Sequence, residues 1–518
     1  MIRTELIAPV SELIRGHAKN SPARLAFRDS HMQVTYGELA ITTANLAGHL
    51  QDAGIEIGDS VAIFLPNSVQ WIESCFATLR AGGVSVPISY ESTVHEVAYR
   101  LEDAQCKVLI TTDARHEMVT SLLASQPQLT HIIFVDRALS HAQGVRFSAL
   151  RHQQAQSVAR DPCSIDETSF IIYTSGTTGR PKGVLLTQRG MLWITAACWA
   201  PIAQLSENDY VLSPLPLFHS YALNFSVLSI LSVGASAYLI EKFSTTEVMQ
   251  QLQSGQFTAL PGVPTMFHYL LEAARNQPDC QFPNLRVCIS AGAIMPAAVN
   301  LEFEQRFGVK LLDGYGITET STMVTMNWMH GSRVMGSCGL ALPGLSVRLI
   351  DPVSGKDVQT GQEGELIVRG PNVMLGYHGK PAETESVLRD GWYFTGDLAK
   401  SDLNGFLTIT GRLKELVIRG GQNIAPAELE EVVCAHAAVL DCAVVGAPHA
   451  YLGEVPVVFV VLRAEMRLTL EVLLEHCRER LSAYKVPAEV YFISEIPRTG
   501  SGKIIRFKLK ETLVDHRG

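Results

Sequence analysis

The stretch YTSGTTGRPKG, residues 173–183, directly follows the apolar run SFII (169–172). Its three glycines let the backbone approach a polyanion closely, and consecutive backbone N–H groups can form a concave anion site. Four serine and threonine hydroxyls add hydrogen-bond donors, while Arg180 and Lys182 add positive charge. The Walker A pattern GxxxxGK[ST] is absent. The stretch therefore predicts a phosphate-binding loop after a buried strand, in preference to an ordinary surface turn.

Short apolar runs similar to SFII recur through the first part of the chain. Examples are VAIFLP (61–66), KVLITT (107–112) and HIIFV (131–135), and helix-like stretches lie between several of them, as at 69–81 and 94–104. Strands that are apolar throughout and alternate with helices are typical of parallel sheets covered on both faces. The predicted fold class is therefore α/β, with mostly parallel sheets in a large N-terminal domain.

After about Leu340 the sequence becomes glycine-punctuated and β-rich, as in SVRLID, GELIVRG and FLTITGR. This pattern predicts a small β-barrel or curved sheet. From Lys414 onward a compact α+β tail follows, with PAELEEVVCAHAAV (426–439) expected as a helix that begins at its proline. We therefore predict domains at 1–411 and 412–518, and because their junction is short, a hinge near 412–414.

Composition excludes several classes of protein. The 518 residues carry 42 basic and 51 acidic side chains, a net charge of −9, whereas a nucleic-acid binder needs a basic stripe. The first twenty residues have scattered charges and do not resemble a signal peptide. Ten cysteines without zinc-site spacing suggest reduced core thiols, and we expect a cytoplasmic protein.

The segment 211–240 contains no Asp, Glu, Lys or Arg, so a hydropathy window would mark it as a membrane span. It nevertheless holds two prolines, six serines and Gly234. A buried strand, loop and helix of a large α/β core explains this composition better.

Five motifs, taken in order, resemble those of the adenylate-forming superfamily, which includes acyl-CoA synthetases, firefly luciferase and the adenylation domains of peptide synthetases. They are YTSGTTGRPKG (173–183), YGITET (315–320), GWYFTGDLA (391–399), GRLKELVIRGGQNIAPAELE (411–430) and PRTGSGKIIR (497–506). In that family a carboxylate attacks the α-phosphate of ATP to give an acyl-adenylate and pyrophosphate, and a second nucleophile then takes the acyl group. Two anions must meet, so catalysis depends on positioning and on neutralising phosphoryl charge.

The resemblance implies roles for the nucleotide-binding residues. Tyr315 would lie beside the adenine, and Asp397 would accept hydrogen bonds from the ribose hydroxyls, supported by Arg412. A turn residue is the ordinary interpretation of an aspartate such as Asp397. The β- and γ-phosphates would contact Thr174, Ser175, Gly176, Thr177, Thr178, Gly179 and Lys182.

The resemblance also implies the catalytic residues. Thr318 would bond a phosphate, Glu319 would hold Mg²⁺ through an oxygen ligand, and Lys503 would reach the α-phosphate and the substrate carboxylate. The alternatives are a carboxylate at a helix start for Glu319 and an exposed, solvated lysine for Lys503.

In the family the C-terminal domain rotates after adenylation, which replaces the Lys503 loop by the GGQN face. Lys414 occupies the hinge position, and Gly420 and Gly421 lie on the acceptor side. Some relatives carry a lysine-rich stretch before this face, whereas VIRGGQN has only Arg419. The cation that assists the second step therefore stays open.

The acid pocket of the family lies between PLFHSYALN (216–224), AGA (291–293) and the segment after YGITE. The candidate substrate-binding residues are His219, Ala291, Gly292, Gly314 and Val324, although His219 is almost equally expected as a satisfied core histidine. Apart from His219, no arginine, lysine or histidine cluster in these segments is suited to a second carboxylate. We therefore favour an apolar monocarboxylic acid.

Several activities remain compatible with the motifs. The leading one is an AMP-forming acid–CoA ligase that uses ATP, Mg²⁺ and CoA. An amide-forming ligase acting on an amino acid, similar to coronafacate ligase, and the loading of a carrier-protein thiol are the alternatives. A non-catalytic nucleotide-binding scaffold or a luciferase-type oxidation is less consistent with the complete motif set. The sequence does not indicate the oligomeric state.

Overall fold

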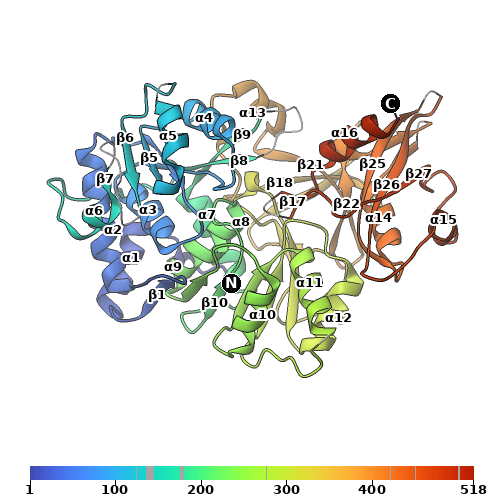
Figure 1. Ribbon diagram of the computed structural model, residues 1–518, viewed down its shortest axis with the longest axis horizontal. Coiled ribbons are helices and arrows are strands. Elements are labelled where there is room, and N and C mark those ends of the chain that lie inside the picture. Colours follow the sequence, from blue (N-terminus) through green and yellow to red (C-terminus); the bar gives the residue numbers. More distant parts are fainter. Residues whose placement is uncertain are drawn as a thin grey trace.

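The computed structural model describes residues 1–123, 125–135, 145–174, 180–275, 277–420, 422–449, 451–499 and 502–517. Within these ranges the chain forms a large lobe that ends with strand β22 at Arg412 and a small lobe that begins with strand β23 at Val417. Figure 1 shows the small lobe, in orange and red, beside the large lobe near helix α11 (Pro264–Arg275).

The first sheet of the large lobe has nine strands, and those from β14 to β1 run parallel. Its strand order is β16 (Leu340–Ala341), β15 (Thr325–Met326), β14 (Lys310–Tyr315), β13 (Val287–Ser290), β12 (Ala259–Gly262), β10 (Tyr210–Ser213), β11 (Ser236–Leu239), β1 (Leu25–Arg28) and β2 (Gln33–Thr35).

The second sheet has eight strands and is parallel from β8 to β7. Its order is β19 (Gly376–Tyr377), β9 (Lys182–Thr187), β8 (Thr168–Thr174), β4 (Val84–Pro87), β3 (Ser60–Phe64), β5 (Val108–Thr111), β6 (His131–Phe134) and β7 (Val145–Arg146). Every residue of β3, β4 and β5 is buried. The prediction of parallel sheets covered on both faces is confirmed.

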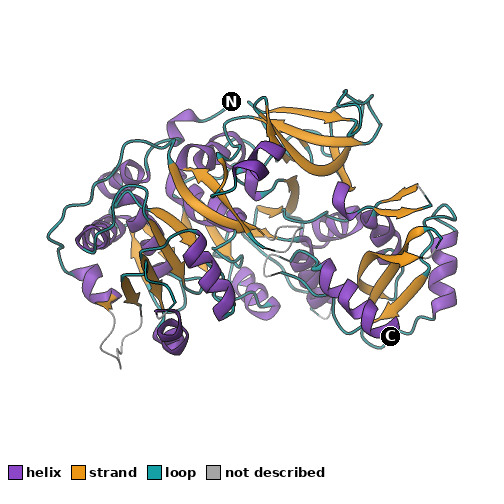
Figure 2. Ribbon diagram, turned by 90° about the horizontal axis from the view of Figure 1, so that it is seen from above, coloured by secondary structure: helices purple, strands orange, loops and turns teal. Residues whose placement is uncertain are grey.

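Helices pack on both sheets, as Figure 2 shows from above. Several begin at a side-chain cap: Thr35 and Glu38 form a reciprocal capping box at α2, and Thr93 and Glu96 form one at α4. The helices of the large lobe are α1 (Val10–Asn20), α2 (Tyr36–Asp52), α3 (Val69–Arg80), α4 (Val94–Asp103), α5 (His116–Leu123), α6 (Phe147–His152), α7 (Gln188–Ile194), α8 (Ser220–Ala222), α9 (Ser229–Val233), α10 (Thr245–Gln253), α11, α12 (Ala297–Phe307) and α13 (Pro381–Val387).

The segment 211–240 is folded into this lobe, as expected. Strand β10, a π-helical turn at Leu223–Leu228, helix α9 and strand β11 account for most of it. The Asn224 amide bonds the Met191 carbonyl oxygen and accepts from the Trp199 indole, so its polar atoms have partners inside the core. Within the described ranges, no helix combines the length and apolar character needed to cross a bilayer.

The β-rich region forms a five-stranded antiparallel sheet of β17 (Ser346–Ile350), β18 (Gly364–Arg369), β21 (Trp392–Ser401), β20 (Leu388–Arg389) and β22 (Leu407–Arg412). A bridge between Gly339 and Leu407 links it to the edge of the nine-stranded sheet.

The small lobe packs helices α14 (Pro426–Cys434), α15 (Leu470–Arg478) and α16 (Arg506–Arg517) on a second five-stranded sheet. Its strand order is β24 (Gln422–Ile424), β23 (Val417–Arg419), β26 (Gly453–Leu462) and β25 (Val439–His449), with β27 (Glu489–Phe492) beside β26. Helix α14 begins at Pro426 as predicted but ends at Cys434, because Val439 already pairs with Leu462 in the sheet. The predicted boundary at 411 and 412 falls at the end of β22, and we keep it as a proposal.

Candidate active site

The predicted phosphate loop closes a hairpin of the eight-stranded sheet. Thr174 of β8 and Lys182 of β9 are cross-strand partners, so the glycine-rich stretch between them connects two adjacent strand ends. Ser175, Gly176, Thr177, Thr178 and Gly179 lie outside the described residues. Helix α4 supports the loop from the side, because the Tyr99 hydroxyl donates to the Pro181 carbonyl oxygen at 2.8 Å.

Lys182 and Glu319 lie on either side of one tyrosine. The Lys182 ammonium is 4.9 Å from the centre of the Tyr377 ring, which is a favourable cation–π distance. The Tyr377 hydroxyl donates to Glu319 Oε1 at 2.9 Å. The loop edge and the predicted magnesium ligand, far apart in sequence, are therefore neighbours in the fold.

A strained turn carries the YGITET motif. A Cβ atom on Gly316 would lie 1.5 Å from the Thr322 carbonyl oxygen, so only glycine fits. The turn then passes through Ser321 and Thr322 with φ of +51° and +110°, which is uncommon for a β-branched residue. The Thr322 hydroxyl donates to the Ser220 carbonyl oxygen at 3.0 Å and holds this conformation. Such strain is characteristic of functional turns.

Asp397 lies at the centre of a polar cluster. It is only 2 % exposed, and its carboxylate forms an ion pair with Arg412, its cross-strand partner, and accepts a hydrogen bond from the Tyr315 hydroxyl. Burial, and then the neighbouring carboxylate, raise the pKa of Tyr315, which keeps the hydroxyl protonated. Three residues expected around the ribose and adenine are thus in direct contact.

The small lobe presents Lys503 on a turn that charged groups hold in place. Arg498 donates to the Gly502 carbonyl oxygen at 2.7 Å and pairs with Asp441 of β25 at 2.8 Å. The Thr499 N–H donates to the Lys503 carbonyl oxygen at 2.8 Å. The side chain of Lys503 therefore projects from a firmly anchored backbone.

This turn docks against the large lobe. A Cβ on Gly502, whose φ is +80°, would lie 2.9 Å from Val263 at the start of α11. Burial lowers the pKa of Lys503, and so does the charge of Arg412, whereas Glu415, Asp397 and Glu319 raise it. Lys503 is thus electrostatically coupled to the residues expected to bind ribose and magnesium.

His219 is also close to Lys503. Burial, followed by the charge of Lys503, lowers the pKa of His219 to about 4. The imidazole is therefore neutral at physiological pH and can serve as an uncharged wall or hydrogen-bonding group.

The segments predicted to surround the acid meet in the fold. Ser220 Oγ and Thr318 Oγ1 are 3.1 Å apart, and the Tyr221 hydroxyl donates to the Ile289 carbonyl oxygen at 3.0 Å, two residues before Ala291. Ala291 is buried, Gly292 is exposed, and Gly314 packs against Met323 and Met326.

Val324 does not join these segments. It packs with Cys338 and with Leu366 and Val368 of strand β18, in the five-stranded sheet of the large lobe. Met323 instead belongs to the buried cluster that holds Tyr221 and Ala291. Val324, expected beside the acid, thus belongs to a different cluster of buried side chains from Tyr221 and Ala291, and its role stays a prediction.

Asp313 is a candidate that the sequence analysis missed. It directly precedes Gly314, it is buried, and its Oδ1 has no hydrogen-bond partner among the described residues. Burial raises the pKa of its carboxyl group well above the usual range. Its position at the carboxyl end of a parallel strand, where ligands bind in open α/β sheets, could have indicated it.

The predicted hinge residue lies between the lobes, and the predicted acceptor-side glycine lies in the small lobe. Lys414 is exposed within the short helical turn Leu413–Glu415, and Gly420 has a φ of +57°. Gly421 lies outside the described residues. Arg419 donates to the Tyr484 carbonyl oxygen at 2.7 Å, so its guanidinium is already engaged within the small lobe.

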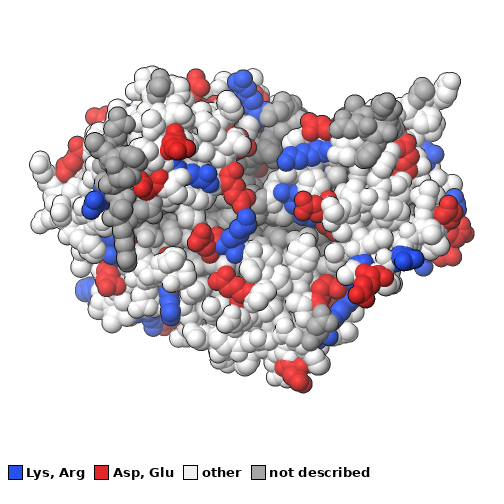
Figure 3. Space-filling view, viewed as in Figure 1, with Lys and Arg blue, Asp and Glu red and all other residues white. Residues whose placement is uncertain are grey.

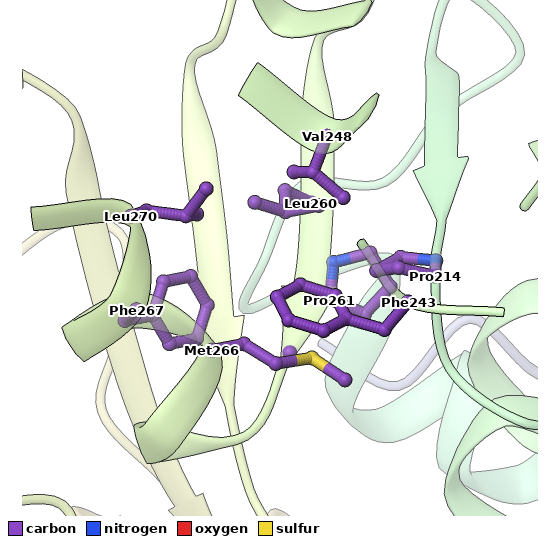
Figure 4. A pocket seen from close by; sticks show the side chains of 9 residues that line it. Pro214, Phe243, Val248, Leu260, Pro261, Met266, Phe267 and Leu270 are labelled. Atoms are coloured by element: carbon purple, nitrogen blue, oxygen red, sulfur yellow. The ribbon is translucent and has the colours of Figure 1, made fainter. Parts of the chain in front are cut away.

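An apolar crevice lies behind the docking point of the lysine turn. It is bounded by residues of β12, α10 and α11 and by Pro214 and Phe243 of the adjoining loops, as drawn in Figure 4, and it is too narrow for a water molecule. Its residues are Pro214, Phe243, Val248, Leu260, Pro261, Gly262, Met266, Phe267 and Leu270. The crevice is core packing that supports Val263. On the face shown in Figure 3, acidic and basic side chains are interspersed and form no basic stripe.

Two family comparisons cover most of the chain. Residues 14–378 match the family described as "AMP-binding enzyme", and residues 428–503 match "AMP-binding enzyme C-terminal domain". A long-chain-fatty-acid–CoA ligase of Bacillus subtilis is 34 % identical over 97 % of this chain and 94 % of its own. A feruloyl-CoA synthase of Amycolatopsis is 35 % identical over 95 % and 96 % of the two chains.

Solved structures show the same two-lobed fold. ATP-bound MatB from Rhodopseudomonas palustris superposes with a TM-score of 0.90 at 31 % identity, covering 98 % of this chain and 100 % of its own. The apo form of that protein gives a TM-score of 0.78 at the same identity and coverage. The arrangement described above is therefore closer to the ATP-bound form.

Proposed function

The chain belongs to the family of AMP-binding enzymes and is an AMP-forming acid–CoA ligase, and we propose that its acid is an apolar monocarboxylate. The acid would be activated on the α-phosphate of ATP with release of pyrophosphate, and CoA would then take the acyl group as a thioester. Relatives named for CoA ligation do not favour an amide-forming ligase or carrier-protein loading.

The observation that carries the first step is the position of Lys503. Its turn docks against the large lobe, where Lys503 is buried and within electrostatic range of Asp397, Glu319 and His219. A cation there would offset the charge of the attacking carboxylate and of the α-phosphate as the two approach. Lys182 at the edge of the glycine-rich loop would neutralise the pyrophosphate end.

The remaining nucleotide contacts follow from the cluster around Asp397. Its carboxylate would accept hydrogen bonds from the ribose hydroxyls while Arg412 holds it in an ion pair and Tyr315 lines the adenine. The unpartnered Oδ1 of Asp313 would accept from the exocyclic amino group of adenine, because a buried acceptor without a partner is costly unless a ligand satisfies it.

We propose that Glu319 holds Mg²⁺ together with the phosphates of ATP. Mg²⁺ in nucleotide sites is commonly held by one or two carboxylates plus phosphate oxygens, and one Glu319 oxygen is oriented by Tyr377. Among the described residues no group of three acidic, histidine or cysteine side chains forms a separate metal site. The ion would neutralise charge that develops on the phosphates.

Three features support an apolar monocarboxylic acid. The acid-pocket segments contain no lysine or arginine that could pair with a second carboxylate. His219 is held neutral, and Tyr221, Met323 and Met326 are buried and mainly apolar. The relatives named for long-chain fatty acids and for ferulate both act on acids with one carboxyl group and an apolar body.

The test is pyrophosphate release from the purified chain with ATP and Mg²⁺ over a panel of aliphatic, aromatic and dicarboxylic acids, each with CoA, amino acids or no acceptor. We expect release with apolar monocarboxylates and thioester product with CoA alone. Turnover restricted to dicarboxylates would overturn the acid class. Amide product with amino acids, and none with CoA, would overturn the acceptor.

A further inference from the structure

Two of the ten cysteines lie against each other in the small lobe, and one of them directly follows Asp441, the partner of Arg498. The Sγ atoms of Cys434, the last residue of α14, and Cys442 of β25 are 3.2 Å apart. All ten cysteines are free thiols in the structure, and most are buried in the core as the sequence suggested. Cys434 is exposed, whereas Cys442 is 3 % exposed.

The surroundings hold the two sulfur atoms in place. The Cys442 thiol donates to the Glu430 carbonyl oxygen, one helical turn before Cys434, at 3.4 Å. The Glu430 carboxylate accepts from the Val444 N–H at 2.8 Å and pairs with Arg506 of α16. Glu430 thereby fastens helix α14 to β25 beside the thiol pair, so little chain entropy remains to be lost if the sulfurs bond.

The remaining movement is small. A disulfide has an S–S length of about 2.05 Å, so the sulfurs need to approach by about 1 Å. Cys434 lies at a helix end, where the backbone has more freedom than in a helix interior. Its exposure also makes it accessible to a reagent, while Cys442 is shielded by the core.

We propose that Cys434 and Cys442 form a reversible dithiol–disulfide site, oxidised by low-molecular-weight disulfides such as oxidised glutathione. The Cys434 thiolate attacks one sulfur of the disulfide, and one thiolate leaves as a mixed disulfide forms. Cys442 then loses its proton and attacks the Cys434 sulfur, which expels the second thiolate. Two protein thiols are oxidised and one small disulfide is reduced to two thiols, and the two protons lost by the protein thiols pass to the expelled thiolates.

The bridge would close a short loop from the end of α14 to β25, both within the small lobe. It would therefore not tie the two lobes together. We expect oxidation to raise the thermal stability of the small lobe through the constraint on its unfolded state, without blocking pyrophosphate release.

The full-length chain, incubated with oxidised glutathione and then alkylated and digested, tests the proposal by mass spectrometry. We expect a Cys434–Cys442 peptide, a fall from ten to eight alkylated thiols per chain, and recovery with reduced glutathione. Cys442→Ala should trap glutathione on Cys434, because the second step is lost. Cys163→Ser, a change at the other exposed cysteine, is the matched control and should leave the bridge unchanged.

Two results would overturn the proposal. One is a stable glutathione adduct on Cys434 of the unmodified chain, since an adjacent thiol should displace it. The other is glutathionylation of Cys163 while Cys434 and Cys442 stay reduced. Neither readout depends on the acid or on CoA, so failure of the proposed function would leave this test intact.

Discussion

Arg463 of the small lobe forms an ion pair with Glu272 of α11 in the large lobe. Glu272 lies on the helix whose start contacts Gly502 of the small lobe. Two separate contacts therefore fix the arrangement of the lobes in which Lys503 lies near Asp397. Both side chains are about three-quarters buried, at 21 % and 27 % exposure. A contact specific to one arrangement stabilises it by its own interaction free energy.

Arg463→Ala is expected to slow acyl-adenylate formation by about two- to fivefold, which corresponds to the loss of one partly exposed ion pair. Transfer from preformed acyl-adenylate to CoA should be unchanged or faster, because the family resemblance implies that this step uses another arrangement of the lobes. Single-turnover assays of the two steps measure this split. Glu272→Gln should behave alike, and Arg467→Ala, at an exposed arginine of the same loop, should have no effect. Equal slowing of both steps by Arg463→Ala would rule out a role in arrangement.

Lys503→Ala is expected to reduce adenylation by about 10²–10³-fold, roughly 3–4 kcal/mol, as for the loss of one preorganised electrostatic donor. Because burial lowers its pKa, Lys503 loses its proton at a lower pH than an ordinary lysine. The kcat/KM of the free enzyme should therefore fall with rising pH below the usual lysine range. In Lys503→Arg, which should keep part of the activity, the fall of kcat/KM should occur at a higher pH. Near wild-type pyrophosphate exchange in Lys503→Ala would contradict the assigned role.

Arg498 is expected to act as a positioning residue for Lys503. Arg498→Ala removes its bonds to the Gly502 carbonyl oxygen and to Asp441. The rate of adenylation should fall by about tenfold, which corresponds to the loss of one charge-assisted hydrogen bond. The alkaline fall of kcat/KM should also move, since the surroundings of Lys503 change. A purely structural role would lower the melting temperature but leave that pH profile in place. Arg480→Ala, at an exposed arginine of the same lobe, is the control.

Lys414→Pro is expected to leave adenylation largely intact while stopping transfer to CoA. Proline restricts φ and removes an N–H donor, and residue 414 lies in the short turn between the last strand of the large lobe and the first strand of the small lobe. The measurement is acyl-adenylate accumulation with thioester formation followed in parallel. Lys414→Ala should keep both steps, and a similar loss of both steps in Lys414→Pro would argue against a hinge here.

The parallel sheets and the meeting of the motifs could be predicted from sequence because both have local signals. An apolar run such as that of β3 is expected to be buried on both faces of a sheet. A polar, glycine-rich stretch that follows such a run is therefore expected at the edge of the sheet where the strand ends. Loops that follow neighbouring parallel strands lie at the same edge of the sheet, so their meeting can be predicted from the strand pattern. The cross-strand pairing of Asp397 with Arg412 follows from two adjacent antiparallel strands.

The remaining features depend on contacts that have no local signal. The Arg498–Asp441 and Arg463–Glu272 pairs join residues from different elements, and surface arginines and acids are common everywhere in the sequence. Val324 was expected beside the acid, and it lies in a different buried cluster from its chain neighbour Met323, which shares a cluster with Tyr221. The YGITE motif alone does not determine which of the two neighbouring side chains, Met323 or Val324, lies in the cluster with Tyr221.

The close approach of Gly316 to the Thr322 carbonyl oxygen limits how this enzyme can be altered by selection. No side chain can be added there without unfolding the turn that carries Thr318 and Glu319. New acid preferences must arise from exchanges among the surrounding side chains, so a library aimed at the turn itself would return mostly dead variants.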